Sequence, residues 1–188
     1  MTTMIRQKGV GMIEVLVALT LLAIGVLGFA ALQLRAVDAT TEANSRIQAM
    51  NLARDLAERI RANQTGLSKS IVVKDGDGKD TDKKISAYLN GFVSKTSIDS
   101  YTWSTCYKNS KCSSSELAAQ DANQILYRAG KMGMKMGFQE CAGSLKRDRN
   151  CIYVAWGNTV PADGTGTDNC TENGNYTPSS QCIVLESY

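Results

Sequence analysis

The longest apolar stretch of the chain covers residues 10–34 and contains a single charged side chain, that of Glu14. At about 1.5 Å per residue, a helix of this length crosses a hydrocarbon core of about 30 Å. The pattern therefore predicts a membrane-spanning helix. A carboxylate inside such a helix costs roughly 2.5–3.5 kcal/mol, so we expect a partner that compensates the charge of Glu14.

A second pattern begins after residue 34, where apolar side chains recur at every third or fourth position. This spacing predicts an amphipathic helix over residues 35–63, continuous with the first because no proline intervenes. The whole helix would be roughly 80 Å long. We expect Gly66 to end it in the left-handed conformation. The positions expected to be buried are Ala43, Ile47, Met50, Ala53, Ala57 and Ile60, widened by Leu52 and Leu56. Three pairs of opposite charges are expected on the wetter face: Glu42 with Arg46, Arg54 with Glu58, and Asp55 with Arg59.

The second half of the chain has the pattern of a small domain with strands and one further helix. Apolar and polar residues alternate over 100–105, which predicts a strand. Ser113 and Glu116 form a capping-box signature for a helix that ends near Gly130. The segment 160–181 is long and polar, so we expect a functional or disordered loop there. Further strands are expected over 134–141, 151–156 and 182–187, the first two as a hairpin.

All six cysteines lie in the second half of the chain. An even number in an exported domain indicates disulfides, and six cysteines allow fifteen connectivities. We expect the sequential set because each bridge closes a short polar loop: Cys106–Cys112, Cys141–Cys151 and Cys170–Cys182. A zinc site is not expected, because the C-x2-C spacing typical of such sites is absent.

The acidic and glycine-rich segment 75–82 raises the possibility of a calcium loop. An EF-hand loop has oxygen ligands at its positions 1, 3 and 5 and glycine at position 6. Counted from Asp75, position 5 is Lys79 and position 6 is Asp80, so this motif fails. We expect a solvated polar turn, with another kind of oxygen cage left open.

The composition argues against most enzymes, because the chain has no histidine and no G-x-S-x-G, P-loop, G-x-G-x-x-G or C-x-x-C motif. Histidine is the commonest general base and the commonest metal ligand. A Ser–Lys pair stays open, since both residues are plentiful and nothing singles out a pair. We therefore expect no enzyme activity and no cofactor. The net charge of +3 falls to +1 if Arg6 and Lys8 are removed, and such a near-neutral protein gives no electrostatic footprint for nucleic acid.

The residues before the apolar stretch form a short basic leader that contains Arg6 and Lys8 and ends in Gly9. The two cations favour a cytoplasmic leader. Cleavage after Gly9 would remove both of them, which lowers the side-chain charge from +3 to +1, and would leave a new amine on Val10. In a low dielectric this amine and the Glu14 carboxylate attract strongly and offset each other's desolvation. The pair can form within one helix, or between neighbours as an assembly contact.

These features resemble a known family. Lys8 and Gly9, then Glu14 and the run VLVAL at 15–19, are similar to the class III signal of type IV prepilins. The run AIGVLG at 23–28 resembles minor pilins of the PilV type, the type IV pilus modification proteins. The resemblance implies that a prepilin peptidase cleaves after Gly9 and methylates the amine of Val10. It also implies that Glu14 contacts the N-terminal amine of a neighbouring subunit.

The fold implied by the resemblance is α+β and pilin-like, with a long N-terminal helix packed on a small antiparallel sheet and stapled by disulfides. Its expected parts are the leader 1–9, the transmembrane or filament-core half 10–34, the amphipathic half 35–63, and a β-rich periplasmic domain 64–188. The protein would pass from the inner membrane, where it spans once, to a pilus at the cell surface.

The function implied is that of a minor pilin that helps prime assembly of a type IV pilus and is incorporated into it, with roles in adhesion and twitching motility. The implied partners are the major pilin, other minor pilins, a tip adhesin, the inner-membrane assembly platform and the prepilin peptidase. A pseudopilin of a type II secretion system is the alternative, and a membrane-anchored periplasmic enzyme is a further one.

Overall fold

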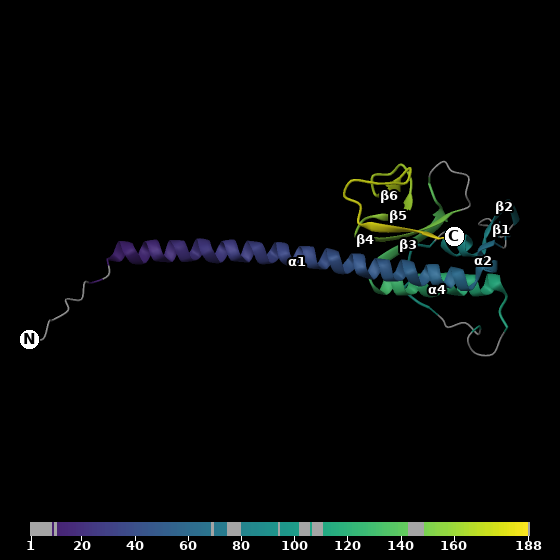
Figure 1. Ribbon diagram of the computed structural model, residues 1–188, viewed down its shortest axis with the longest axis horizontal. Coiled ribbons are helices and arrows are strands. Elements are labelled where there is room, and N and C mark those ends of the chain that lie inside the picture. The colour runs from purple at the N-terminus through teal and green to yellow at the C-terminus, as the bar shows by residue number, and fades with distance from the viewer. Residues whose placement is uncertain are drawn as a thin grey trace, which may run out of the picture. The chain divides into compact units, whose positions relative to one another are not determined.

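The computed structural model describes residue 9 and residues 11–68, 70–74, 80–93, 95–101, 106, 111–142 and 149–187. The chain divides into two units, Met1–Asn44 and Ser45–Tyr188. Helix α1 (Met12–Ala62) contributes residues to both units (Figure 1). The single long helix predicted from the apolar pattern is therefore confirmed.

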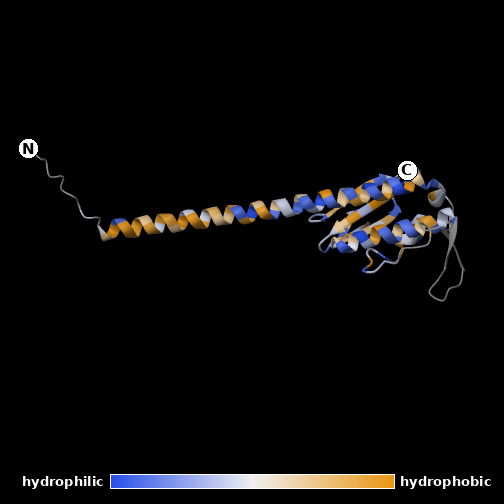
Figure 2. Ribbon diagram, turned by 90° about the horizontal axis from the view of Figure 1, so that it is seen from below, coloured by the Kyte–Doolittle hydropathy of each residue, from blue (hydrophilic) through white to orange (hydrophobic). Residues whose placement is uncertain are grey.

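In the first unit, α1 is a helix without interruption, and it continues through Gly25 and Gly28. Its side chains are predominantly hydrophobic, as Figure 2 shows by colour. The most apolar window of α1 has a mean hydropathy of 2.7, which is enough to cross a membrane by length and composition. A signal sequence passes the same test, so the result fits either a membrane-spanning helix or a signal sequence.

The part of α1 in the second unit buries a face that only partly matches the predicted one, although Leu52, Ala53, Leu56 and Ile60 are buried as expected. Ile47 is 62% exposed, and Met50 and Ala57 are half-buried. Ala43, which belongs to the first unit, is also exposed. The buried face is centred on Leu52 and Leu56, which the prediction placed at its margin. The pattern left this open, because apolar positions three and four residues apart define several overlapping stripes on one helix. The buried residues are Ala49, Leu52, Ala53, Leu56 and Ile60.

The end of α1 also differs from the expectation. The helix ends at Ala62, Asn63 forms a turn, and the short helix α2 (Gln64–Ser68) follows. Gly66 lies inside α2 and is buried rather than left-handed. A Cβ at Gly66 would lie 2.6 Å from Nδ2 of Asn63 and 2.9 Å from the carbonyl oxygen of Ser114. The glycine is therefore required by close packing at this junction.

Three elements follow α2 that the sequence patterns did not predict. Strands β1 (Ser70–Lys74) and β2 (Asp80–Ser86) form a two-stranded antiparallel sheet. Helix α3 (Ala87–Phe92) starts directly after them, and the Ser86 side chain accepts a hydrogen bond from the backbone N–H of Leu89. Much of the predicted 100–105 strand lies outside the described residues, as do residues 75–79 of the tested calcium loop.

Helix α4 (Ser114–Lys131) has the predicted start. Ser113 is its N-cap, and the capping box with Glu116 is present. The predicted end is confirmed to within two residues, since the helix ends at Lys131, and the left-handed residue that follows is Gly133, with φ of 68°. A Cβ at Gly130 would lie 2.8 Å from the carbonyl oxygen of Ile98, so glycine at this position leaves room for the backbone of Ile98 to pack against α4.

The central sheet has the strand order β3-β4-β8 and is antiparallel throughout. Its strands are β3 (Met134–Glu140), β4 (Asn150–Trp156) and β8 (Cys182–Ser187). The predicted hairpin and the predicted last strand are confirmed. On the hairpin, Met134 pairs with Trp156 and Glu140 with Asn150.

The main core lies between this sheet and helices α1, α3 and α4. In Figure 1, α4 runs beside the second-unit part of α1, and the sheet lies over them. Ile125 and Leu126 of α4 and Tyr88 of α3 are fully buried in this core. The sheet contributes Met134, Met136, Phe138, Ile152, Val154 and Trp156. The methionines at 134 and 136 thus fill the core, as their usual role suggests.

The opposite face of the sheet is covered by a layer where a long loop was expected. Strands β5 (Val160–Asp163), β6 (Asn169–Glu172) and β7 (Asn175–Tyr176) form a small sheet with parallel and antiparallel pairs. Asn173 and Gly174 both have positive φ, 51° and 81°, as a tight hairpin turn between β6 and β7 requires. The prediction of a loop over 160–181 is therefore wrong.

Three disulfides staple the second unit: Cys106–Cys112, Cys141–Cys151 and Cys170–Cys182. These are the three pairings expected from short-loop closure. The second joins the ends of β3 and β4, and the third joins β6 to β8, so it holds the outer layer against the central sheet. The fold is α+β, with the long helix packed on small sheets and stapled by disulfides.

Candidate assembly site at the start of α1

The expected processing site lies directly before α1. Gly9 is exposed and belongs to no helix or strand, while Val10 lies outside the described residues. The helix begins at Met12, and the carbonyl of Gly11 accepts a hydrogen bond of 3.0 Å from the backbone N–H of Glu14. Gly9 is therefore exposed close to a helix start, and exposure of this kind gives a peptidase access.

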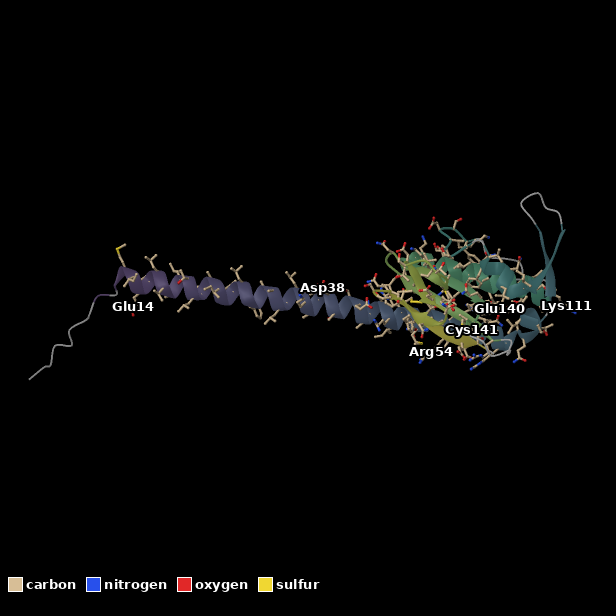
Figure 3. All side chains as sticks on the ribbon, turned by 90° about the horizontal axis from the view of Figure 1, so that it is seen from above. Glu14, Asp38, Arg54, Lys111, Glu140 and Cys141 are labelled. Atoms are coloured by element: carbon tan, nitrogen blue, oxygen red, sulfur yellow. A yellow bond between two sulfur atoms is a disulfide. The ribbon has the colours of Figure 1, made fainter. Side chains whose placement is uncertain are left out.

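Glu14 lies in the first turn of α1, where the partial positive charge of the helix terminus favours a carboxylate. Its side chain is exposed and projects away from the helix (Figure 3). Within the described part of the chain, the carboxylate has no hydrogen-bond or ion-pair partner. Thr20 differs, since its hydroxyl donates to the carbonyl of Val17 at 2.8 Å and is satisfied within the helix. Glu14 is thus the charged group of the apolar segment that still needs a partner.

The apolar side chains along the segment are exposed, as the Glu14 side chain is. Met12 is 86% exposed and Leu32 is 71% exposed. A Cβ at Gly25 or Gly28 would meet no atom within 4 Å, so nothing in this subunit requires glycine at either position. An apolar surface of this extent requires lipid or other helices around it.

A polar network joins the helices of the second unit, and the sequence patterns indicated only its Asp55–Arg59 pair. Asp121 of α4 is nearly buried, with 5% of its side chain exposed, and forms an ion pair of 2.9 Å with Arg59 of α1. The hydroxyl of Tyr88 donates to the other carboxylate oxygen of Asp121 at 2.8 Å. Arg59 also donates to Asp55 and Gln124, at 2.8 and 2.5 Å. The network joins α1, α3 and α4 at one place.

The electrostatic consequences of this network follow from burial and pairing. Burial alone would lower the pKa of Arg59, but its hydrogen bonds to Asp55 and Asp121 outweigh that effect and raise the pKa. Burial raises the pKa of Tyr88, and the neighbouring Asp121 carboxylate raises it further. Arg59 therefore stays charged and Tyr88 stays neutral at physiological pH.

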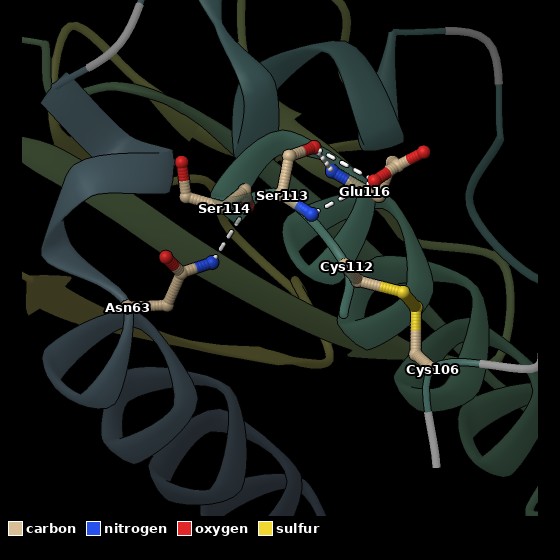
Figure 4. The surroundings of a disulfide bond; sticks show 6 residues. All are labelled: Asn63, Cys106, Cys112, Ser113, Ser114 and Glu116. Atoms are coloured by element: carbon tan, nitrogen blue, oxygen red, sulfur yellow. Dashed lines mark hydrogen bonds between the residues drawn. A yellow bond between two sulfur atoms is a disulfide. The ribbon is translucent and has the colours of Figure 1, made fainter. Parts of the chain in front are cut away.

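A second polar contact fixes the end of α1 to the start of α4 (Figure 4). The amide of Asn63 donates to the carbonyl of Ser114 at 2.8 Å. Next to it, the backbone N–H and the hydroxyl of Ser113 both donate to Glu116, at 2.8 and 2.9 Å. The backbone hydrogen bond is the larger cause of the lowered pKa of Glu116. Cys112, bridged to Cys106, immediately precedes this cap.

One group of potential metal ligands occurs among the described residues: Cys141, Cys151 and Glu186. The two cysteines form a disulfide, so they offer no thiolate, and Glu186 forms an ion pair of 2.8 Å with Arg149. The group is therefore a structural cluster at one end of the sheet.

Comparison with known proteins gives two family matches, both in the N-terminal part of the chain. Residues 4–30 match the model of the prokaryotic N-terminal methylation motif. Residues 31–72 match the model of type IV pilin Tt1218. No curated protein and no solved structure matches the chain. The chain thus carries a prepilin-type methylation motif, followed directly by a segment similar to a type IV pilin.

Proposed function

We propose that this chain is a minor pilin that is processed after Gly9 and incorporated into a type IV pilus through α1. The observation that carries the proposal is the position of Glu14, a carboxylate without a partner among the described residues, inside an exposed apolar segment. Processing would create an amine on Val10, four residues away. A neighbouring subunit that supplies this amine would neutralise Glu14 and cover the apolar face at the same time.

The mechanism is mechanical rather than catalytic. Before assembly, the apolar segment holds the subunit in the inner membrane. During assembly, pairing of Glu14 with an amine on the neighbour replaces the solvation that the carboxylate lacks in lipid. The disulfides and the network around Asp121 keep the second unit folded on α1, so force on the helix is transmitted to a stable domain.

The finer assignment is to the PilV type, based on the AIGVLG run at 23–28. The proposed partners are the major pilin, other minor pilins, a tip adhesin and the inner-membrane assembly platform. A prepilin peptidase would process the leader. The proposed location is the inner membrane, with the second unit in the periplasm, and then the pilus.

We propose no enzymatic activity. The described chain has an open groove of about 420 Å³ between the second-unit part of α1 and strand β8. Its charged side chains are engaged, Glu58 with Arg61 and Glu186 with Arg149. Arg54 also lines it, but an arginine is a poor general base because it stays protonated.

The test is a deletion strain complemented with the wild-type chain, with Glu14→Ala or with Thr20→Val. Pili and twitching should return with the wild type and with Thr20→Val, whose hydroxyl is satisfied inside the helix. Glu14→Ala should reach the membrane in normal amounts but enter pili poorly. Full incorporation of Glu14→Ala would refute the proposed contact. Loss of type II secretion with normal pili in the deletion strain would favour a pseudopilin.

A further inference from the structure

Two charged side chains lie just beyond the C-terminal end of the apolar segment. Arg35 and Asp38 of α1 are both exposed, and neither side chain forms an ion pair or hydrogen bond among the described residues. They are three residues apart, so they lie on the same side of the helix, with the cation nearer the N-terminus. This order is the less favourable one for pairing within a helix. Both charges are therefore available to another molecule.

The position of Arg35 along α1 matches one boundary of a membrane. Arg35 follows Glu14 by 21 residues, about 32 Å along a helix, and a hydrocarbon core is about 30 Å thick. The sequence between them contains no charged side chain. A helix that spans the core therefore brings the two charges to opposite boundaries at the same time. In this position Glu14 reaches water, and it enters hydrocarbon only when α1 is drawn out during assembly.

The apolar segment lacks the tyrosine and tryptophan side chains that commonly anchor a helix at a membrane boundary. The first tyrosine of the chain is Tyr88 and the first tryptophan is Trp103, both far beyond the segment. Arg35 is thus the residue that can fix the depth of α1 at this boundary. Its planar guanidinium suits phosphate, which it binds through two parallel hydrogen bonds, while its stem extends along apolar surface. Phospholipids supply phosphate at this depth.

We propose that Arg35 and Asp38 together bind the headgroup of a phospholipid that carries an ammonium group, such as phosphatidylethanolamine. In such a headgroup, the phosphate is attached to the glycerol and the ammonium lies at the outer end. Arg35, nearer the apolar segment, pairs with the phosphate. Asp38, about 4.5 Å further along the helix, pairs with the ammonium. The inference rests on the proposed function, because it requires the apolar segment to span a membrane.

The charge of Asp38 decides which class of lipid fits. The headgroup of phosphatidylglycerol has a phosphate but no ammonium, so it would leave the Asp38 carboxylate near a second negative group without a compensating cation. A headgroup with both charges satisfies both side chains in the order in which α1 presents them. The contact lies at the edge of the hydrocarbon, where the dielectric is lower than in water and the attraction is stronger. It holds the subunit at a defined depth until assembly draws α1 out.

The test measures which lipids stay bound to the full-length chain. The purified chain is reconstituted into bilayers that contain equal amounts of phosphatidylethanolamine and phosphatidylglycerol. It is then returned to a mild detergent, and native mass spectrometry counts the lipids that it retains. One charge at a membrane surface changes binding by a factor of about five. The wild type should therefore retain about fivefold more phosphatidylethanolamine than phosphatidylglycerol.

Two variants change the proposed partners one at a time. Asp38→Lys places a second cation beside Arg35, so the preference should reverse to about fivefold in favour of phosphatidylglycerol. Arg35→Leu removes the phosphate contact, so the retention of phosphatidylethanolamine should fall about fivefold. Arg54→Leu removes an exposed arginine that lies further along α1, in the second unit. It is the matched control and should retain lipids as the wild type does.

Equal retention of the two lipids by the wild type would overturn the inference. So would an unchanged preference in Asp38→Lys, or unchanged retention in Arg35→Leu. These outcomes are distinct from failure of the proposed function, because lipid retention is measured without pili. If the wild type shows no preference while Glu14→Ala still fails to enter pili, the Glu14 contact stands and the lipid contact is wrong. If the preference is present while Glu14→Ala enters pili normally, the lipid contact stands and the Glu14 contact is wrong.

Discussion

Replacement of Asp121 by alanine should be among the most destabilising single changes in the second unit. The substitution removes the carboxylate that pairs with Arg59 and accepts from Tyr88. Loss of one partner from a buried ion pair costs about 3–5 kcal/mol. Arg59 keeps Asp55 and Gln124 and is 21% exposed, so the cost should lie lower, at about 2–3 kcal/mol.

The assay is thermal unfolding of the full-length chain in detergent, followed by near-UV circular dichroism as a measure of tertiary packing. For a domain of this size, about 1 kcal/mol shifts the midpoint by about 2–4 °C, so Asp121→Ala should lower it by about 5–10 °C. Asp121→Asn keeps an acceptor for Tyr88 and should lose less. The reasoning fails if Asp121→Ala is no worse than Glu58→Gln, which alters an ion pair whose side chains are 68% and 69% exposed.

Three further predictions concern processing, pH and the disulfides. Gly9→Val should leave an uncleaved, membrane-bound precursor on immunoblots, and a product of normal mature size would exclude this processing site. The folded-state pKa of Tyr88 is raised by burial and by Asp121, so its contribution to stability is complete below about pH 10 and is lost as the pH rises further. Denaturant unfolding should therefore show falling stability above about pH 10, and Tyr88→Phe should reduce that fall; an unchanged pH profile in the variant would contradict the assignment. Removal of the Cys170–Cys182 bridge by paired serine substitutions should cost about 2–4 kcal/mol, because it frees the outer layer from β8. The same change at Cys106–Cys112, whose loop is shorter, should cost less, and equal losses would argue against this role.

The parts of the fold that were predictable from the sequence are those set by local patterns. The apolar segment and the absence of proline give α1, and the Ser113–Glu116 capping box gives the start of α4. The hairpin of β3 and β4 follows from two apolar runs, each with a cysteine beside the loop that connects them. Each of these signals is contained within a few residues, so the rest of the fold is not needed to interpret it.

The outer layer was missed because its strands are short and one of its pairings is parallel. β5 and β6 have four residues each, too few to show a period of two. The Asn173–Gly174 dipeptide was a usable signal for the hairpin of β6 and β7, since both residues favour positive φ. No local signal indicates that β5 would cover the central sheet, where a Cβ at Gly137 would collide with the carbonyl oxygen of Pro161.

The margins of the buried face of α1 and the wider network around Arg59 were missed for a related reason. Asp55 and Arg59 have the spacing of a solvated pair on one helix, and they do form it at 2.8 Å. Only the position of α4 reveals that Asp121 joins them and that Arg128 pairs with Asp55. Charge patterns along one helix cannot identify the acid that a second helix will supply. The expected Arg54–Glu58 pair is absent among the described contacts, where Glu58 pairs with Arg61 instead.

The candidate site was accessible from the sequence to a greater degree, because a charge in an apolar segment is anomalous by itself. What the structure adds is that Glu14 stands in the first turn of α1 without a partner for its carboxylate in the described chain. The proposed partner belongs to a neighbouring subunit.

The most direct test is mass spectrometry of the N-terminus of the protein purified from its native membranes and from pili. Our account requires that the mature chain begin at Val10 and carry one methyl group on its amine, because this amine is the proposed partner of Glu14. A chain that still contains the first nine residues, or that begins at any other position, would contradict it.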